Sequence, residues 1–452
     1  MNNAKIAVAV KFCGGDLNPF DGAALECALR TGSRDITAVT MAPESAIPRM
    51  KQLTRLGVRA VVLTDAAFAG ADTLATARTL AAYIKTLSPD YVFCGRQSTD
   101  GDTAQVPPCL AAILGYGIVP SVMSINGKQV NLRGGESVGL TGKQVVTFER
   151  IAPLRFPSMR SACAAVQTVG NDVLRIPADK CGQKGSPTRV VKVFENTAGR
   201  RNCEFTDYSR LDDIIADALK KQRIRPEEYT GPVLRKVYYV KEAADVARAI
   251  AAEAEELPVD GKSAAEIAET IRSSGARTVL WPDSAEMRVM APQVAGLTGA
   301  GLCADCTRLK TDGEKLYMIR PAAGGSVTAE IECRAPVTMA TVRTACGSND
   351  DVIFAVGRGA EHALPQIRAY AEKYGARLMC SRAAVDDGVM PYECQVGLTG
   401  VSVAPKVYVA IGISGAVQHM CAAERAGTVI AVNKDKNTRI FDFADYGMVT
   451  EV

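Results

Sequence analysis

The sequence has few of the residues that build metal centres and catalytic acid/base pairs. It contains 2 histidines, and its one CxxC spacing, Cys303 to Cys306, has no second cysteine pair at zinc spacing and no nearby histidine. The 14 cysteines are scattered through apolar segments, which favours reduced, buried thiols over disulfides. We therefore expect no metal site, and no nucleophile or acid/base pair stands out.

Long apolar runs and a strong charge of one sign are also lacking. No run approaches the length that spans a bilayer, and the N-terminal MNNAKIAVAV is too short in its apolar part for a secretory leader. The 53 Lys and Arg stand against 49 Asp and Glu, a net charge of +4 that gives no general attraction to nucleic acid. These features predict a cytoplasmic protein with no membrane insertion and no nucleic-acid partner.

Strand-like apolar runs alternate with amphipathic helices from Lys5 onward. This alternation is typical of an α/β protein with parallel, helix-flanked sheets. We expect a nucleotide-binding-like domain over 1–170, an extended arm with a charged helix and a linker over 171–232, a short α/β domain over 233–345, and a nucleotide-binding domain over 346–452. A hairpin is expected over 126–148, helices over 286–297 and 362–374, and another helix from Ser414.

Polar, glycine-containing loops follow several predicted strands, where α/β sheets bind ligands beside helix N-termini. In the first part these loops are AAFAGADT and GRQSTDGDTAQ; in the last they are GRG, SR, QVGLTG, GISGAVQH and VNKD. Taken alone, GISG is either a phosphate-binding turn or a tight turn with Ser414 as helix N-cap. His419 is likewise either structural or functional on this evidence. Several polar loops at one sheet edge indicate a large polar ligand.

The order of these motifs resembles a known family. Residues 357–447 resemble the FAD domain of electron transfer flavoprotein α subunits, and GLCADCTRL with RPAAGGSVTAEIEC resembles the end of the α-subunit N-terminal domain. NPFDGAALECALR, GRQSTDGDTAQV and PLRFPSMR resemble β-subunit segments. The resemblance covers nearly the whole chain and implies a fusion of a β-like part with a shortened α-like part.

The resemblance implies FAD in the last domain. Arg382 would lie over the isoalloxazine ring and favour a negatively charged flavin, Thr399 would bond near N5, and His419 would bond the carbonyl at C2. Arg358 would add a cation near the ring. The other implied contacts to FAD are Ser381, Gln395, Val396, Gly397, Gly400, Gly412, Ile413, Ser414, Gly415, Ala416, Gln418, Asn433, Lys434, Asp435 and Glu451, the last replacing a common Asp.

The β-like part implies a second adenine nucleotide, AMP in simple carriers and FAD in the electron-bifurcating group, with phosphate at a helix start near Thr103. The implied contacts are Ala9, Asn18, Gly95, Ser98, Asp102, Thr103, Ala104, Gln105 and Val106. The 66–73 loop favours the bifurcating group, with NADH and ferredoxin or flavodoxin as partners. The absence of the family's usual hairpin between Lys11 and Asn18 favours the other group.

Two functions remain open at this stage. One is an electron carrier, rather than a substrate-converting enzyme, that exchanges electrons with an acyl-CoA dehydrogenase-like flavoenzyme through the 155–166 segment, which is otherwise an ordinary exposed arm. The other is an adenine-nucleotide-binding regulatory or scaffold protein without electron transfer, because the α-like part lacks a block after about Pro258 and the chain stops at Val452.

Overall fold

The computed structural model describes residues 1, 3–195, 200–220, 229–343, 351–397 and 399–451. It divides into two compact units: Met1–Lys192, Gly231–Ala323 and Ala329–Val342 form unit 1, and Val193–Thr230, Gly324–Thr328 and Arg343–Val452 form unit 2. Residues 221–228 of the arm, helix and linker region expected over 171–232, and the boundary expected at 345–346, lie outside the described residues. The helices of the described residues do not combine the length and apolar composition needed to cross a membrane.

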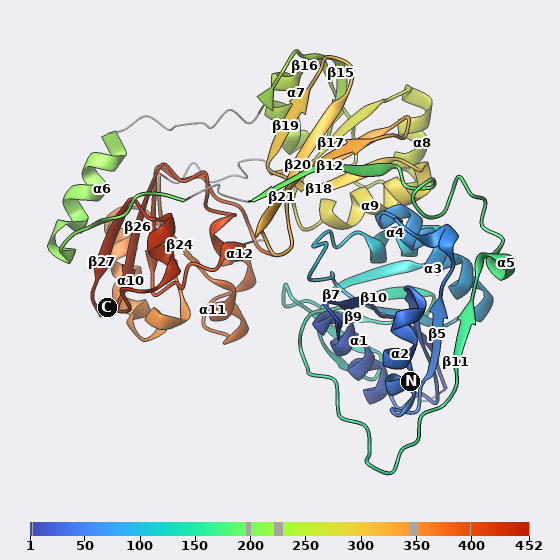
Figure 1. Cartoon of the computed structure of the whole chain (residues 1–452). Coiled ribbons are helices and arrows are strands. Elements are labelled where there is room, and N and C mark those ends of the chain that lie inside the picture. Colours follow the sequence, from blue (N-terminus) through green and yellow to red (C-terminus); the bar gives the residue numbers. More distant parts are fainter. Residues whose placement is uncertain (2, 196–199, 221–228, 344–350, 398, 452) are drawn as a thin grey trace. The chain divides into compact units, whose positions relative to one another are not determined.

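The first part of unit 1 is built on a nine-stranded sheet (Figure 1). Its order is β11 (Val166–Val169), β5 (Arg59–Leu63), β4 (Asp35–Met41), β1 (Lys5–Ala9), β6 (Tyr91–Gly95), β10 (Gln144–Phe148), β7 (Gly117–Asn126), β8 (Gln129–Leu132) and β9 (Ser137–Gly139). The strands from β11 to β7 pair in parallel, and β8 and β9 are antiparallel.

Helices cover both faces of this sheet. Residues of α1 (Pro19–Arg30) and α2 (Ile47–Thr54) share one core with Ile6 and Val8, and residues of α3 (Thr73–Leu87) and α4 (Val106–Leu114) share the other with Ala7. Burial on both faces explains why the central strands read as continuous apolar runs.

The remainder of unit 1 holds a second parallel sheet and an antiparallel one. The parallel order is β16 (Ala251–Glu256), β15 (Leu234–Tyr239), β17 (Thr278–Pro282), β22 (Thr338–Val342) and β18 (Gly301–Cys306), with helices α7 (Ala244–Ile250), α8 (Ala264–Ser274) and α9 (Met287–Thr298). Beside it lie β12 (Thr188–Glu195), β21 (Val327–Cys333), β20 (Leu316–Ala322) and β19 (Arg308–Thr311). The strand β14 (Tyr229–Thr230) precedes β15 in the chain.

Helix α9 packs closely on α4. A Cβ at Gly296 would lie 3.2 Å from the carbonyl oxygen of Cys109, and the Cys109 thiol donates to the Pro292 carbonyl oxygen at 3.0 Å. The two halves of unit 1 therefore meet through backbone-close helix packing.

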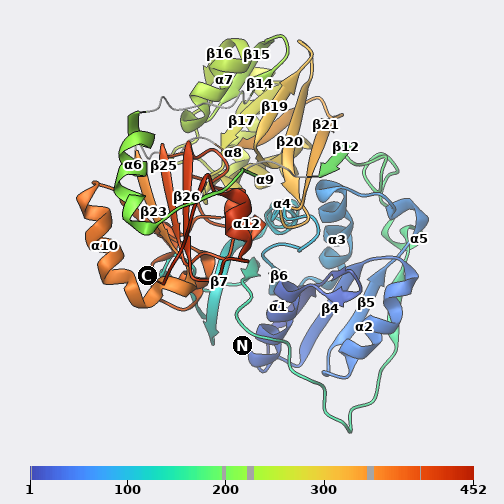
Figure 2. The ribbon, with the colours of Figure 1, turned by 60° about the vertical axis from the view of Figure 1, so that its left-hand side comes forward.

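Unit 2 is a six-stranded parallel sheet. Its order is β13 (Glu204–Phe205), β27 (Tyr446–Val449), β26 (Thr428–Asn433), β25 (Val407–Ile411), β23 (Val352–Val356) and β24 (Arg377–Cys380). Residues of α6 (Leu211–Lys220) and α10 (Leu364–Lys373) share one core with β23 and β25, and α12 (Val417–Met420) contributes to the other (Figure 2). The helix α11 (Arg382–Asp386) follows β24.

Parallel, helix-flanked sheets confirm the predicted fold class, but three local expectations differ. The hairpin expected over 126–148 is present in its first part, where β8 pairs antiparallel with β7 and β9, but β10 inserts in parallel between β6 and β7. The helix expected from Ser414 begins at Val417, because Gly412 and Gly415 hold left-handed φ angles of 63° and 78°. The sequence lacks the longer hairpin that the family usually has between Lys11 and Asn18. The structure nevertheless forms a small hairpin there, β2 (Phe12–Cys13) with β3 (Asp16–Leu17).

Candidate functional site

A cavity of about 430 Å³ lies in unit 1 where the order of the strands reverses. The sheet grows from β1 through β4 to β5 on one side and through β6 on the other. Ligands of doubly wound sheets bind at such a switch point, beyond the carboxyl ends of the strands. The loops after β1 and β6 line this cavity, together with the start of α3 and the start of α4.

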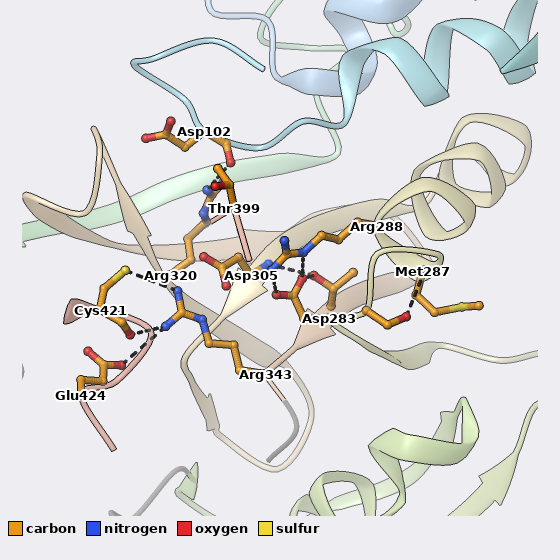
Figure 3. A network of polar contacts seen from close by, with 12 residues as sticks. Asp102, Asp283, Met287, Arg288, Asp305, Arg320, Arg343, Thr399, Cys421 and Glu424 are labelled. Carbon is orange, nitrogen blue, oxygen red and sulfur yellow. Dashed lines mark hydrogen bonds and ion pairs between the residues drawn. The ribbon is translucent and has the colours of Figure 1, made fainter. Parts of the chain in front are cut away.

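The cavity brings together the residues expected at the second nucleotide site, apart from Asp102. The lining includes Ala9, Asn18, Gly95, Ser98, Thr103, Ala104, Gln105 and Val106. Asp102 has other contacts: its carboxylate accepts from Gln97 Nε2 at 3.2 Å, and its carbonyl oxygen accepts from Arg320 Nη2 at 3.3 Å (Figure 3). Asp102 therefore shapes the 95–106 loop instead of lining the cavity.

Two buried amide side chains in the cavity have polar atoms without partners among the described residues. Asn18 is 1% exposed and Gln105 is 2% exposed, yet Asn18 Oδ1 and Gln105 Nε2 make no hydrogen bond there. The Asn18 amide nitrogen donates to the Gln97 carbonyl oxygen at 2.8 Å, which fixes the orientation of its oxygen. Burying an unsatisfied donor or acceptor costs about 1–3 kcal/mol. A polar ligand would supply both missing partners.

Asp21, which we did not expect in the site, ties the cavity walls together. Its carboxylate accepts from the backbone nitrogens of Lys11 at 2.8 Å and Gly95 at 3.0 Å. Burial raises the pKa of Asp21 to about 7. A Cβ at Gly95 would lie 2.3 Å from Asp21 Oδ1, so glycine is required there. The sequence did offer a signal for this residue, because Asp21 is a carboxylate within the largely apolar stretch PFDGAALECAL.

The loop before α4 carries backbone strain. Asp102 and Ala104 have φ angles of 51° and 54°, which non-glycine residues adopt rarely. The loop leads into α4 at Val106, two residues later than Ala104, with Gln105 at the N-cap. Pro107 and Pro108 follow Val106 and carry no N–H, so the backbone N–H groups that this helix start can offer to a phosphate come from the residues before Pro107.

The second candidate site lies at the switch point of the unit 2 sheet, between β23 and β25. Here β24 lies outside β23, whereas β26 and β27 continue beyond β25. The GRG loop after β23 and the GISG loop after β25 touch: the Gly359 nitrogen donates to the Gly412 carbonyl oxygen at 3.2 Å. A Cβ at Gly357 would lie 2.2 Å from that same oxygen. Glycine thus lets two ligand-facing loops pack backbone to backbone.

His419 and Ser381 hold buried polar atoms that lack partners in the described part of this unit. His419, 6% exposed, shares a 2.7 Å hydrogen bond between Nε2 and Tyr408 Oη, and its Nδ1 makes none. Burial lowers the pKa of His419 to about 4, whereas the Val396 backbone acts in the opposite direction. The imidazole is therefore neutral at pH 7. Ser381 Oγ, directly after β24, is also unpartnered.

Two arginines of this unit pair with carboxylates at α11. Arg382 Nε lies 3.1 Å from Asp386 Oδ2, and its side chain is 33% exposed. Arg358 Nε lies 2.7 Å from Asp387 Oδ2, with a side chain that is 65% exposed. Arg382 is thus the more enclosed cation of the two at the carboxyl ends of the strands.

The other loops are fixed by internal hydrogen bonds. Gln395, fully buried, donates to Thr399 Oγ1 at 2.7 Å, and Asn433 donates to the Ile413 carbonyl oxygen at 3.0 Å. These two amides therefore position Thr399 and the GISG loop. Of the other expected contacts, Val396, Ile413 and Gly415 are buried, Gly397 has a φ of 145°, Gly400 packs on Gln395, and Ser414, Ala416, Gln418, Lys434, Asp435 and Glu451 are exposed.

Both units have a point where the order of the strands in the sheet reverses, glycine-containing loops at that point, and buried polar groups without partners among the described residues. Together they are typical of α/β proteins that bind ligands at the switch points of their sheets. Comparison with known families identifies the class further. The model of the electron transfer flavoprotein domain matches residues 8–150 and 231–369, and that of the electron transfer flavoprotein FAD-binding domain matches 348–424. The chain belongs to the electron transfer flavoprotein family.

Individual relatives agree with this assignment. An electron transfer flavoprotein subunit alpha of Mycobacterium tuberculosis is 31% identical over 222 residues, covering 40% of this chain and 69% of the relative. Protein FixA of Azorhizobium caulinodans is 32% identical over 234 residues, covering 46% and 83%. Protein FixB of Rhizobium meliloti is 34% identical over 213 residues, covering 36% and 60%. The expectation of this family from the sequence motifs is confirmed.

Proposed function

We propose that this chain is an electron carrier that combines β-like and α-like parts, holding FAD in unit 2 and an adenine nucleotide in the unit 1 cavity. The observation that carries the proposal is the set of buried, unpartnered polar atoms at both switch points: Asn18 Oδ1, Gln105 Nε2, Ser381 Oγ and His419 Nδ1. Bound FAD would supply reversible uptake of one or two electrons. Ser381, Ser414 and the GISG backbone would hold its pyrophosphate, and Arg382, Thr399 and His419 would contact its ring.

The residues present fit these ligands. In the tautomer in which Tyr408 donates to Nε2, the proton of the neutral His419 ring sits on Nδ1 and can be donated to a ligand carbonyl. In unit 1, a cavity of about 430 Å³ suits a nucleotide of AMP size. Ala71, Asp72 and Thr73 of the 66–73 loop also line that cavity. This volume matches AMP more closely than the larger FAD, so AMP is the occupant we propose.

The two sites can be tested separately with Gln105→Leu. Nucleotides released from the purified parent chain should be FAD and AMP, whereas the variant should retain FAD and bind AMP about fivefold more weakly, from loss of one hydrogen bond of about 0.5–1.5 kcal/mol. Because leucine also removes an unsatisfied buried donor, stability without nucleotide should not fall. Calorimetric titration and thermal melts measure both effects.

The matched control is Gln52→Leu on the exposed face of α2, which should change neither quantity. A colourless parent that releases only AMP would support the scaffold alternative over electron transfer. If the purified chain contains two FAD and NADH bleaches the flavin, the ligand of the unit 1 site is FAD and not AMP. If the parent and Gln105→Leu bind AMP with equal affinity, Gln105 does not contact AMP.

The 155–166 loop is the proposed docking segment for an acyl-CoA dehydrogenase-like partner. Phe156 is 97% exposed and Met159 is 98% exposed. The base of the loop is held: Arg155 pairs with the buried Glu26 carboxylate at 2.8 Å, and Arg55 Nη2 donates to the Ser158 carbonyl oxygen at 3.2 Å. Although burial opposes it, bonding to Arg155 and Arg30 lowers the pKa of Glu26 to about 2. The loop thus presents two apolar side chains from an anchored base.

Phe156→Ala is expected to slow electron exchange with a dehydrogenase partner at limiting concentration by at least about fivefold, because aromatic anchors contribute more than 1 kcal/mol to interfaces. Flavin content and melting temperature should be unchanged, since the side chain is almost wholly exposed. Val173→Ala, at a residue 64% exposed in another segment, is the control. Equal rates for Phe156→Ala, Val173→Ala and the parent would exclude this loop as the docking segment.

A further inference from the structure

A second cavity in unit 1, of about 400 Å³, shares no lining residue with the nucleotide cavity. Four separate segments form it: Arg78 comes from α3, residues 179–187 form a turn before β12, and Gly299 and the pair Arg334 and Ala335 come from the second half of the unit. The cavity therefore lies where the β-like and α-like halves of this unit meet. Neither half alone contains all of its walls.

The lining is strongly basic. Four cationic side chains, Arg78, Lys180, Lys184 and Arg334, face one carboxylate, that of Asp179. None of the four cations takes part in an ion pair with another described residue. Nearby cations behave differently, since Arg189 and Lys315 share the carboxylate of Glu332 at 2.8 and 3.1 Å. An excess of unpaired positive charge in a concave site attracts anions.

Hydrogen bonds and close backbone contacts join the segments that carry these cations. Arg78 Nη1 donates to the Gly185 carbonyl oxygen at 3.4 Å, and a Cβ at Gly299 would lie 3.3 Å from Arg78 Nη2. A Cβ at Gly182 would lie 2.1 Å from the Ala67 carbonyl oxygen, which fixes the turn against the 66–73 loop. The Arg334 nitrogen donates to the Pro187 carbonyl oxygen at 2.7 Å. These contacts fix the backbone positions from which the cationic side chains extend.

We propose that this basic cavity binds a phosphate-bearing small molecule through two or more linked phosphate groups. Four cations and one carboxylate suit a ligand with several negative charges, and guanidinium groups bind phosphate oxygens in pairs. The described lining contains no aromatic side chain on which a base would stack. The volume also exceeds that of a single oxyanion. A polyphosphate chain, rather than a base or a lone phosphate, matches this combination.

The test is calorimetric titration of the full chain with pyrophosphate at low ionic strength, after saturation with AMP so that the nucleotide cavity is filled. Arg78→Gln and Arg334→Gln should each weaken pyrophosphate binding at least tenfold, and Arg78→Lys should recover part of the loss. Lys85→Gln, which removes one exposed charge from the same helix α3, should leave the affinity unchanged. Arg334 is exposed, so its replacement should not disturb folding.

Three results would overturn the proposal. The first is no heat of binding for the parent chain. The second is equal affinity of the parent and both arginine variants, which would locate pyrophosphate elsewhere. The third is tighter binding of a heptaglutamate peptide than of pyrophosphate, with the same sensitivity to Arg78→Gln and Arg334→Gln, which would make the cavity a docking site for an acidic protein segment.

Discussion

Ser414→Trp is expected to yield a folded chain that has lost at least nine-tenths of its FAD. Ser414 is exposed, between Gly412 and Gly415 at the end of β25, so an indole there meets little of the protein core. It would instead occupy the space beyond the switch point, where the proposed pyrophosphate lies against the GISG backbone. The ratio of flavin absorbance to protein, with extraction of the bound nucleotides, measures the loss.

The matched control is Glu372→Trp, which places the same indole on the exposed side of α10. It should retain the flavin content of the parent. AMP bound in unit 1 should be unaffected by both variants, which distinguishes a local block from general misfolding. Stoichiometric FAD in a folded Ser414→Trp chain would show that the pyrophosphate does not lie at this loop.

Arg382→Ala should bind FAD but lower the flavin reduction potential by about 60 mV or more. Reduction places negative charge on the flavin, and a fixed cation beside it favours the charged form. Removing Arg382 also removes the cation that lies 3.1 Å from the Asp386 carboxylate in the parent, so the site becomes more negative. A tenfold change in this equilibrium is about 1.4 kcal/mol, or about 59 mV for one electron. Spectroelectrochemical titration of the holoprotein measures the shift.

Three further variants test whether the effect belongs to this residue. Arg382→Lys keeps the charge but loses the planar guanidinium, so a smaller decrease is expected. His419→Ala should act in the same direction more weakly, because a neutral imidazole contributes one hydrogen bond of about 0.5–1.5 kcal/mol. Arg358→Ala should have the smallest effect, because that side chain is 65% exposed. If Arg382→Ala and the parent have the same flavin reduction potential, the flavin ring does not lie beside Arg382.

Local composition was a poor guide where the tertiary environment decides the conformation. The stretch AAEAEE consists of good helix formers, yet it is strand β16, paired in parallel with β15 at the edge of a sheet. The run before Phe148 reads as one arm of a hairpin, but β10 lies between β6 and β7 because both of its faces are covered in the core. Pairing partners distant in sequence leave no local signal of this kind.

The sequence by itself determined the family, the α/β class and the identity of the loops at the carboxyl ends of the strands. Apolar runs report strand burial, and glycine-rich motifs report close backbone approach; both are encoded within a few neighbouring residues. Only the tertiary structure decided which polar atoms remain unpartnered, as with Gln105 and His419, that Asp21 joins two loops, and that Arg78 and Arg334 face one cavity. Each of these depends on contacts between segments far apart in the chain, and charge, burial and hydrogen bonding there are properties of the assembled fold.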